Sequence, residues 1–165
     1  MSEEEFAVGT ALVTGAASGM GQATAAMFLD RGWRVLGLDI AANLGIDHPA
    51  LTALTVDIRD GEAVSAVVGA AVASTGIDAV ANIAGFYPPT TLQTFTDEHF
   101  RTIFDVNVLG LLHVTRAAVA HMNPGSAIVN FASVDAFTVS PGQLLYGASK
   151  AAVVMLTKEL ALELA

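Results

Sequence analysis

The chain has 165 residues, a formal net charge of −9 and no Cys; 53% of its residues are hydrophobic and only 14% are charged. This length fits one domain with a substantial core, and the missing Cys excludes disulfides and thiolate metal sites. The acidity argues against a nucleic-acid partner, because affinity for phosphates comes mainly from Lys and Arg. The shortage of charge, against about 25% in an average soluble domain, indicates that part of the surface is covered by a partner or by further chain.

The sequence also bears on membranes and location. No window contains the ~18 uninterrupted apolar residues that a membrane helix needs. The start of the chain at 2–5 is acidic, unlike the basic start of a secretory leader. We therefore expect a cytoplasmic protein with no membrane partner.

Five short apolar runs alternate with helical patterns along the chain. We predict strands at Ala11–Thr14, Arg34–Asp39, Leu54–Asp57, Ala79–Asn82 and Ala127–Phe131. None of these runs alternates strictly, which is typical of strands covered on both faces. Strands that alternate with helices predict a doubly wound α/β fold, in which a parallel sheet has helices on both faces.

The segments between the strands have apolar residues at helical spacing. One such pattern covers residues 60–72 and is followed by Gly76 as a stop. Thr96 is an N-cap candidate for a long helix whose apolar face runs from Phe100 to Met122.

Small or polar residues lie at or just beyond the ends of the predicted strands. They are Thr14–Gly15, Asp39, Asp57, Asn82 and Ser133. In an open parallel sheet the ligand crevice lies outside the carboxyl ends of the strands. The sequence therefore delivers polar groups from five strands to one edge of the sheet.

A glycine-rich segment, Thr14–Gly21, joins the first strand to the first helix. Its three glycines let the backbone turn sharply and approach a diphosphate. The free N–H groups at the start of the helix then bind the diphosphate without a cation. A merely structural tight turn is the alternative, but the position between a strand and a helix favours phosphate binding.

Asp39 ends the second predicted strand. An acidic residue there hydrogen-bonds the adenosine ribose hydroxyls of NAD and repels the 2′-phosphate of NADP. No Lys or Arg occurs from residue 37 to residue 50. These observations predict NAD as the cofactor, with Asp39 as a simple turn residue being the alternative.

Tyr146 and Lys150 form the pattern Y-x-x-x-K, which places them on one face of a helix, about 6 Å apart along its axis. Redox chemistry between an alcohol and a carbonyl needs a group that moves a proton, and a nearby ammonium favours the phenolate form of a Tyr. A chance pair on a solvated helix is the alternative. Asn107 lies on a predicted apolar stripe, where an amide must find partners, and a structural amide bonded to the backbone is the alternative for it.

In combination these motifs resemble the classical short-chain dehydrogenases/reductases. The glycine spacing is similar to the family's T-G-x-x-x-G-x-G, and Ser133 and Tyr146 stand in the family's order. The resemblance implies a Rossmann sheet with the strand order 3-2-1-4-5. The cofactor-binding residues that it implies are Gly15, Ser18, Gly19, Met20, Gly21, Asp39, Asp57, Ile58, Asn82, Ala84, Gly85, Tyr146 and Lys150.

The resemblance also implies catalytic roles. Tyr146 would be the general acid/base, Lys150 would hold the nicotinamide ribose, and Ser133 would orient the substrate oxygen. Asn107 would hold a water linked to Lys150. The implied function is that of an NAD-dependent oxidoreductase acting on a small alcohol or carbonyl substrate, with no metal. A non-catalytic NAD-binding module remains an alternative, as does a nucleotide-sugar epimerase or dehydratase, whose glycine spacing is usually different.

Family members continue beyond the last predicted helix with further strands and a substrate-covering segment. We therefore expect residues 1–165 to form a single dinucleotide-binding and catalytic domain that lacks the C-terminal strands and the substrate lid. In relatives, the helices that correspond to 100–122 and 146–165 pack across a two-fold axis. The resemblance thus implies a homo-oligomer, a dimer or a tetramer.

Overall fold

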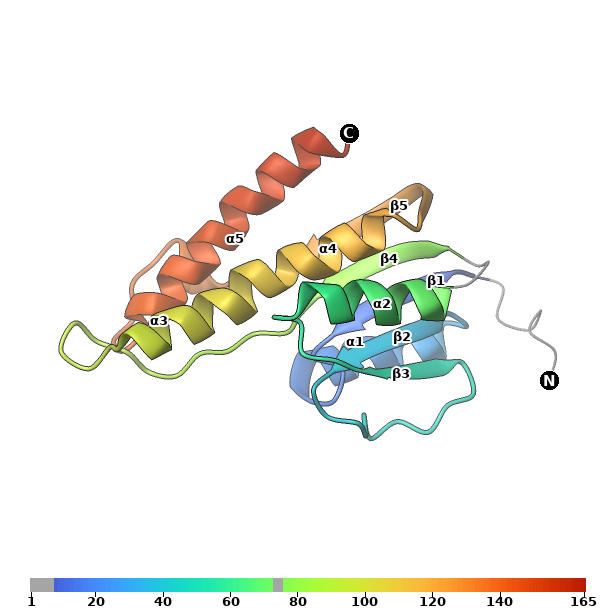
Figure 1. The fold of residues 1–165 in the computed structure, drawn as a ribbon, viewed down its shortest axis with the longest axis horizontal. Helices are drawn as coiled ribbons and strands as arrows, with labels where there is room; N and C mark the ends of the chain where they lie inside the picture. The colour runs from blue at the N-terminus through green and yellow to red at the C-terminus, as the bar shows by residue number, and fades with distance from the viewer. Residues whose placement is uncertain (1–7, 73–75) are drawn as a thin grey trace.

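A five-stranded parallel sheet forms the centre of the computed structural model, which describes residues 8–72 and 76–165 (Figure 1). The strands are β1 (Thr10–Thr14), β2 (Arg34–Asp39), β3 (Leu51–Thr55), β4 (Ile77–Asn82) and β5 (Met122–Asn130). They are ordered β3-β2-β1-β4-β5, and every neighbouring pair is parallel. The predicted doubly wound fold and its strand order are confirmed.

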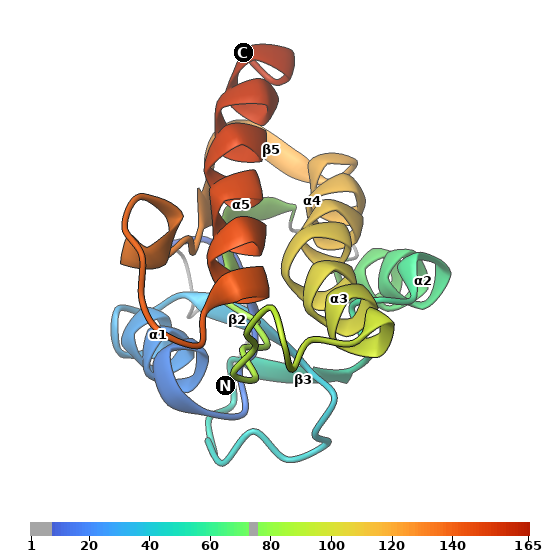
Figure 2. The ribbon, with the colours of Figure 1, turned by 90° about the vertical axis from the view of Figure 1, so that its left-hand side faces the viewer.

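Helices cover both faces of this sheet, as the end-on view shows (Figure 2). The helical segments are α1 (Gly19–Asp30), α2 (Gly61–Val72), α3 (Asp97–Phe104), the π-helical η2 (Asp105–Gly110), α4 (Leu111–Val119), the 3-10 turn η3 (Val134–Ala136) and α5 (Leu144–Glu163). Helix α1 lies on one face, and α2 and α4 lie on the other. Helix α5 packs beside α3 and η2.

Two apolar clusters, one on each face, hold the layers together. Leu12 of β1 is buried in the cluster beneath α2 and α4, while its neighbours Ala11 and Val13 are buried in the cluster beneath α1. Successive side chains of a strand point to opposite faces. A strand that is buried on both faces therefore has a continuous apolar sequence, which is the pattern from which β1 was predicted.

Several elements differ from their predicted bounds, most of all β3, β5 and the long helix before β5. β3 begins at Leu51, earlier than predicted, because its pairing with β2 starts there, opposite Val35. As an edge strand β3 is only half buried, so its apolar signal is weak. Thr96 caps α3 as predicted, since its side chain accepts a hydrogen bond from the His99 N–H. The helix ends at Val119, however, and Met122 opens β5 opposite Ile77.

The helical run Asp97–Val119 is long and apolar enough, by length and composition alone, to cross a membrane. Its apolar side chains Ile103, Leu111 and Val114 are buried in the described structure, and Val114 belongs to the cluster between the sheet and α2. This burial is typical of a core helix that covers a sheet.

Candidate active site

A groove of about 630 Å³ lies at the carboxyl ends of the strands, where α1 and α5 begin. Most of the predicted site residues line it. They are Gly15, Ser18, Gly19, Met20, Gly21, Asp39, Asp57, Ile58, Ala84, Gly85, Tyr146 and Lys150. Asn82, Asn107 and Ser133 lie outside this lining, in positions described below.

The glycine loop has a shape that only glycines allow. Gly15 has a φ of +68°, and a Cβ on Gly21 would overlap the carbonyl oxygen of Gly15. Ser18 is the N-cap of α1, but its side chain makes no capping hydrogen bond. The first-turn N–H groups of α1 are therefore available to an anion that enters the groove. This cradle fits the diphosphate of a dinucleotide.

Thr14 fastens the glycine loop to the end of β4. Its hydroxyl, in a side chain that is 1% exposed, accepts hydrogen bonds from the N–H groups of Ile83 at 2.9 Å and Ala84 at 3.0 Å. A Cβ on Gly15 would lie 3.1 Å from the Ala84 Cα, so the two strand ends approach closely here. The sequence pointed to Thr14 as the end of a strand and the first residue of the glycine motif, but not to this contact, because a buried hydroxyl between two strands leaves no periodic signal.

Asp39 is held against the glycine loop. One carboxylate oxygen accepts a hydrogen bond from the Ala17 N–H and the other from the Ala41 N–H, both at 3.0 Å. Each oxygen keeps a second acceptor site. The carboxylate is thus fixed at the end of the groove and can still accept a hydrogen bond from a ligand.

Arg59 is a groove residue that the sequence analysis missed. Its guanidinium donates to both oxygens of Asp57, over distances of 2.6–3.0 Å. This hydrogen bonding lowers the pKa of Asp57 below its ordinary value. The sequence did contain a signal for this ion pair, because Arg59 stands two positions after Asp57, at the end of a predicted strand.

Tyr146 and Lys150 lie on the first turns of α5, on the same side of the groove as β5. The Lys150 Nζ donates to the Phe131 carbonyl at 2.6 Å and lies 5.8 Å from the centre of the Tyr146 ring. The Lys150 side chain is 4% exposed, and its burial lowers its pKa. The ring of Tyr87 stands 5.8 Å from that of Tyr146, tilted by 57°.

Asn107 lies on η2 and uses its amide to join two parts of the site. Its oxygen accepts from the Phe86 N–H at 2.7 Å, and its nitrogen donates to the Phe86 carbonyl at 2.9 Å and to the Ser149 hydroxyl at 3.0 Å. The residue is 2% exposed. In this arrangement the side chain connects the loop after β4 to α5, next to Lys150.

Ser133 and Asn82 are the other two predicted residues that lie outside the groove lining. Ser133 is the N-cap of η3, where its hydroxyl accepts from the Asp135 N–H at 3.1 Å. The Asn82 amide lies between the sheet and α4. Its nitrogen donates to the Thr115 hydroxyl at 3.1 Å and to the Asn130 side-chain oxygen at 2.9 Å. Asn82 therefore joins β4, β5 and α4.

Comparison with known proteins agrees with this fold. The family model described as short chain dehydrogenase matches residues 9–165, so the chain belongs to the short-chain dehydrogenase family. It is 34% identical to an uncharacterized oxidoreductase of Methylorubrum extorquens, over 94% of this chain and 66% of that protein. It is 36% identical to 2-(R)-hydroxypropyl-CoM dehydrogenase of Xanthobacter autotrophicus, over 94% of this chain and 68% of that one. The chain thus spans about two thirds of the length of these relatives.

Solved structures are similar over the same part of the chain. Ligand-free aldohexose dehydrogenase of Thermoplasma acidophilum has a TM-score of 0.88 at 29% identity, covering 94% of this chain and 61% of that one. A 4-hydroxyisoleucine dehydrogenase complexed with NADH has a TM-score of 0.83 at 28% identity, covering 94% and 69%. ElxO with NADP bound has a TM-score of 0.86 at 26% identity, covering 94% and 67%. Similar folds therefore occur with either nicotinamide cofactor.

Proposed function

We propose that this chain forms the cofactor-binding and catalytic part of an NAD-dependent oxidoreductase that acts on a small alcohol or carbonyl substrate. The observation that carries the proposal is that Tyr146 and Lys150 line the same groove as the glycine loop and Asp39. A proton-transferring pair and a dinucleotide cradle thus share one cavity.

The bound nicotinamide would supply or accept the hydride. The Tyr146 hydroxyl would give a proton to the substrate oxygen during reduction, and the phenolate would take one during oxidation. Lys150 is buried beside the Tyr146 ring. Its ammonium has two N–H donors beyond the one that contacts Phe131, and these would bind the nicotinamide ribose.

The preference for NAD rests on Asp39. Its carboxylate is fixed by two backbone N–H groups at the end of the groove, where it would accept from ribose hydroxyls and repel a 2′-phosphate. Arg59 also lines this groove, and its guanidinium forms an ion pair with Asp57. Its charge is therefore already balanced by a carboxylate.

A screen of NADH oxidation over a panel of aldehydes and ketones tests the function. We expect turnover with at least one carbonyl class, and we expect Tyr146→Phe to lower kcat by 10²–10⁴-fold, the usual contribution of a positioned acid/base. NADH affinity should stay nearly the same, because only the hydroxyl is lost.

Tyr87→Phe is the matched control, since it removes the hydroxyl of the neighbouring ring. It should leave kcat within a few-fold of the wild type. A Tyr146→Phe variant that keeps more than about a tenth of kcat would show that Tyr146 is not the acid/base.

A further inference from the structure

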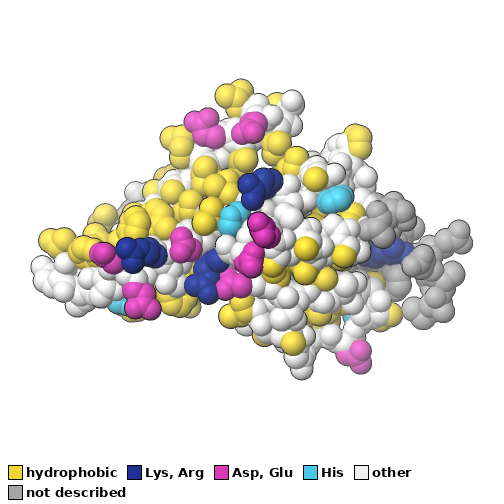
Figure 3. All heavy atoms as spheres, viewed as in Figure 1, with side chains coloured by type: hydrophobic (Ala, Val, Ile, Leu, Met, Phe, Trp, Pro, Cys, Tyr) yellow, Lys and Arg dark blue, Asp and Glu magenta, His cyan; other side chains and the backbone are white. Residues whose placement is uncertain are grey.

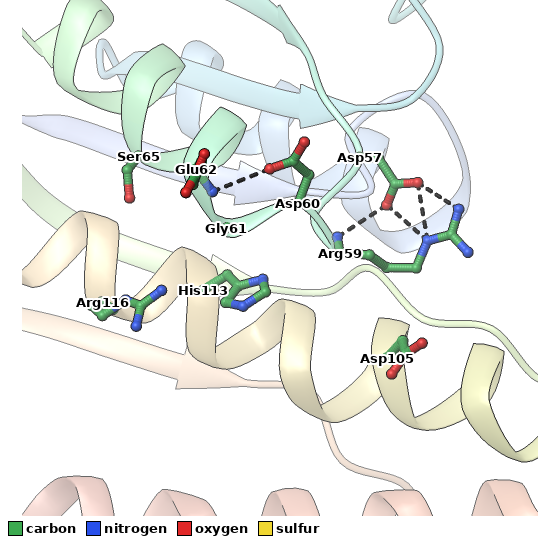
Figure 4. Close-up of a pocket in the computed structure, with 9 residues that line it drawn as sticks. All are labelled: Asp57, Arg59, Asp60, Gly61, Glu62, Ser65, Asp105, His113 and Arg116. Carbon is green, nitrogen blue, oxygen red and sulfur yellow. Dashed lines mark hydrogen bonds and ion pairs between the residues drawn. The ribbon is translucent and has the colours of Figure 1, made fainter.

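The loop that connects β3 to α2 lies between two hollows. Asp57 and Ile58 of the loop line the cofactor groove, and Asp57 also borders the second hollow. This second hollow has a volume of about 1050 Å³ and lies next to α4, where His113 and Arg116 lie below the loop (Figure 4). A side chain of α4 that contacts this loop from below can therefore position the groove-lining residues of the loop, although it lies outside the groove itself.

His113 makes such a contact. Its Nδ1 lies 3.0 Å from the Ile58 carbonyl oxygen, so a protonated Nδ1 donates a hydrogen bond to the loop. The imidazole ring lies directly beneath Gly61, as Figure 4 shows. A Cβ on Gly61 would be 2.8 Å from the ring Cδ2 and 2.9 Å from Nε2. The missing side chain of Gly61 therefore makes room for the ring.

A second close contact runs in the opposite direction. The Ile58 side chain is 8% exposed and packs over Gly110, where a Cβ would lie 2.6 Å from the Ile58 Cγ1. The His113 ring thus occupies the space left by Gly61 at the start of α2, and the Ile58 side chain occupies the space left by Gly110 of η2. This arrangement fixes the height of the loop above α4.

None of the other described hydrogen bonds of the loop reaches α4, and the Val56 N–H donates to the Asp39 carbonyl of β2. In the described chain, the other hydrogen bonds of residues 57–60 stay within the loop or run to the start of α2, as between Asp57 and Arg59 and from the Asp60 carboxylate to the N–H groups of Glu62 and Ala63. Among the residues that the structure describes, the hydrogen bond between His113 and Ile58 is therefore the one that connects this wall of the groove to α4.

We propose that His113 is a positioning residue for the adenosine half of the dinucleotide, acting through Ile58. The proposal rests on the proposed function, since it assumes that the groove binds NAD. It predicts that loss of the Nδ1 donor loosens the wall formed by Asp57 and Ile58 and weakens binding of the adenosine half, while the nicotinamide half, at Tyr146 and Lys150, is unaffected.

The test compares His113→Leu with His113→Asn. NADH fluorescence titration gives the Kd for the whole cofactor, and calorimetry with ADP-ribose gives that for the adenosine half. We expect His113→Leu to weaken both by about three- to tenfold, the range for one lost hydrogen bond. The Asn amide nitrogen can take the place of Nδ1, so His113→Asn should recover most of the affinity. The emission of bound NADH at saturation should match that of the wild type.

Two further variants complete the design. His121→Leu replaces an exposed histidine just beyond the end of α4 and should change nothing. Gly61→Ala keeps His113 but displaces its ring, so it should weaken ADP-ribose binding as His113→Leu does, and it keeps the test open should His113→Leu fail to fold. The double variant should be no weaker than His113→Leu alone, because both changes break one contact.

Three results would overturn the proposal: an unchanged ADP-ribose affinity in folded His113→Leu, no recovery in His113→Asn, or a changed emission of bound NADH, which would indicate a general structural effect. Failure of the proposed function gives a different pattern. A wild type that binds ADP-ribose but shows no NADH binding or turnover contradicts that function, while the ADP-ribose measurements still decide the role of His113. A wild type that binds neither ligand overturns both.

Discussion

The ammonium group of Lys150 is buried and has little contact with solvent. The side chain is 4% exposed, one N–H donates to the Phe131 carbonyl, and burial lowers its pKa. A buried charge with few partners reduces stability, so its presence beside Tyr146 is better explained by ligand binding and proton transfer than by folding. Ionisable groups with shifted pKa values are commonly found at functional sites.

This interpretation predicts a pH-dependent stability difference for Lys150→Met. Because the folded pKa of Lys150 lies below the unfolded value of about 10.4, the unfolded chain binds more protons between the two values. The free energy of unfolding of the wild type therefore rises with pH through that window. The variant lacks this rise, so its stability relative to the wild type should be greatest near neutral pH and should fall toward about pH 10. Urea unfolding at the two pH values measures this.

The same variant should bind NADH more weakly, because the ribose donors are lost. Fluorescence titration checks this at neutral pH. Parallel stability profiles of the two proteins from pH 7 to about pH 10 would contradict the assignment of a burial cost to Lys150.

At the scale of elements, the sequence predicted most of the sheet and part of the site. β1 and β2 were predictable because both of their faces are covered, which requires continuous apolar runs. The half-buried edge strand β3 and the π-helical η2 were harder, because neither has a strong period in the sequence. The groove lining at Gly15–Gly21 and Asp39 followed from local motifs. The contacts of Thr14 and His113 did not, because they connect residues far apart in sequence.

Thr14 shows how such a contact supports the groove. Thr14→Val keeps the shape of the side chain but leaves the buried N–H groups of Ile83 and Ala84 without their acceptor. We expect a loss of about 2–4 kcal/mol in the free energy of unfolding, since each unsatisfied buried donor costs about 1–3 kcal/mol. Urea denaturation measures the change. Thr14→Ser keeps the hydroxyl and should lose about 1 kcal/mol. Equal stabilities of the two variants would show that the hydroxyl does not hold β1 to β4.

At the scale of the whole molecule, hydrophobic side chains gather over the face formed by α3, α4 and α5 (Figure 3). The exposed large hydrophobic residues on these helices and η2 include Phe100, Leu109, Leu144, Met155 and Leu162. A contiguous exposed apolar surface marks an interaction site. We propose that this face is the two-fold interface of a homodimer or tetramer, since a two-fold interface uses the same surface on both copies.

Size-exclusion chromatography with light scattering tests this assembly. We expect a dimer or tetramer, and we expect Met155→Glu to shift the population toward the monomer, because the substitution places a charge on an apolar interface. Met27→Glu is the matched control, since Met27 is an exposed methionine on α1, across the sheet. A wild type that is monomeric at all concentrations would contradict the proposal.

The central claim is that the groove binds NAD with Asp39 at its adenosine end, and calorimetric titration with NAD and NADP tests it most directly. We expect NAD to bind more tightly, by about tenfold or more, which corresponds to 1.4 kcal/mol. Asp39→Asn keeps the volume and one acceptor oxygen but removes the charge. It should therefore reduce the difference between the affinities for NAD and NADP, mainly by improving NADP binding. Equal or tighter binding of NADP by the wild type, or a gap that Asp39→Asn leaves unchanged, would contradict the account.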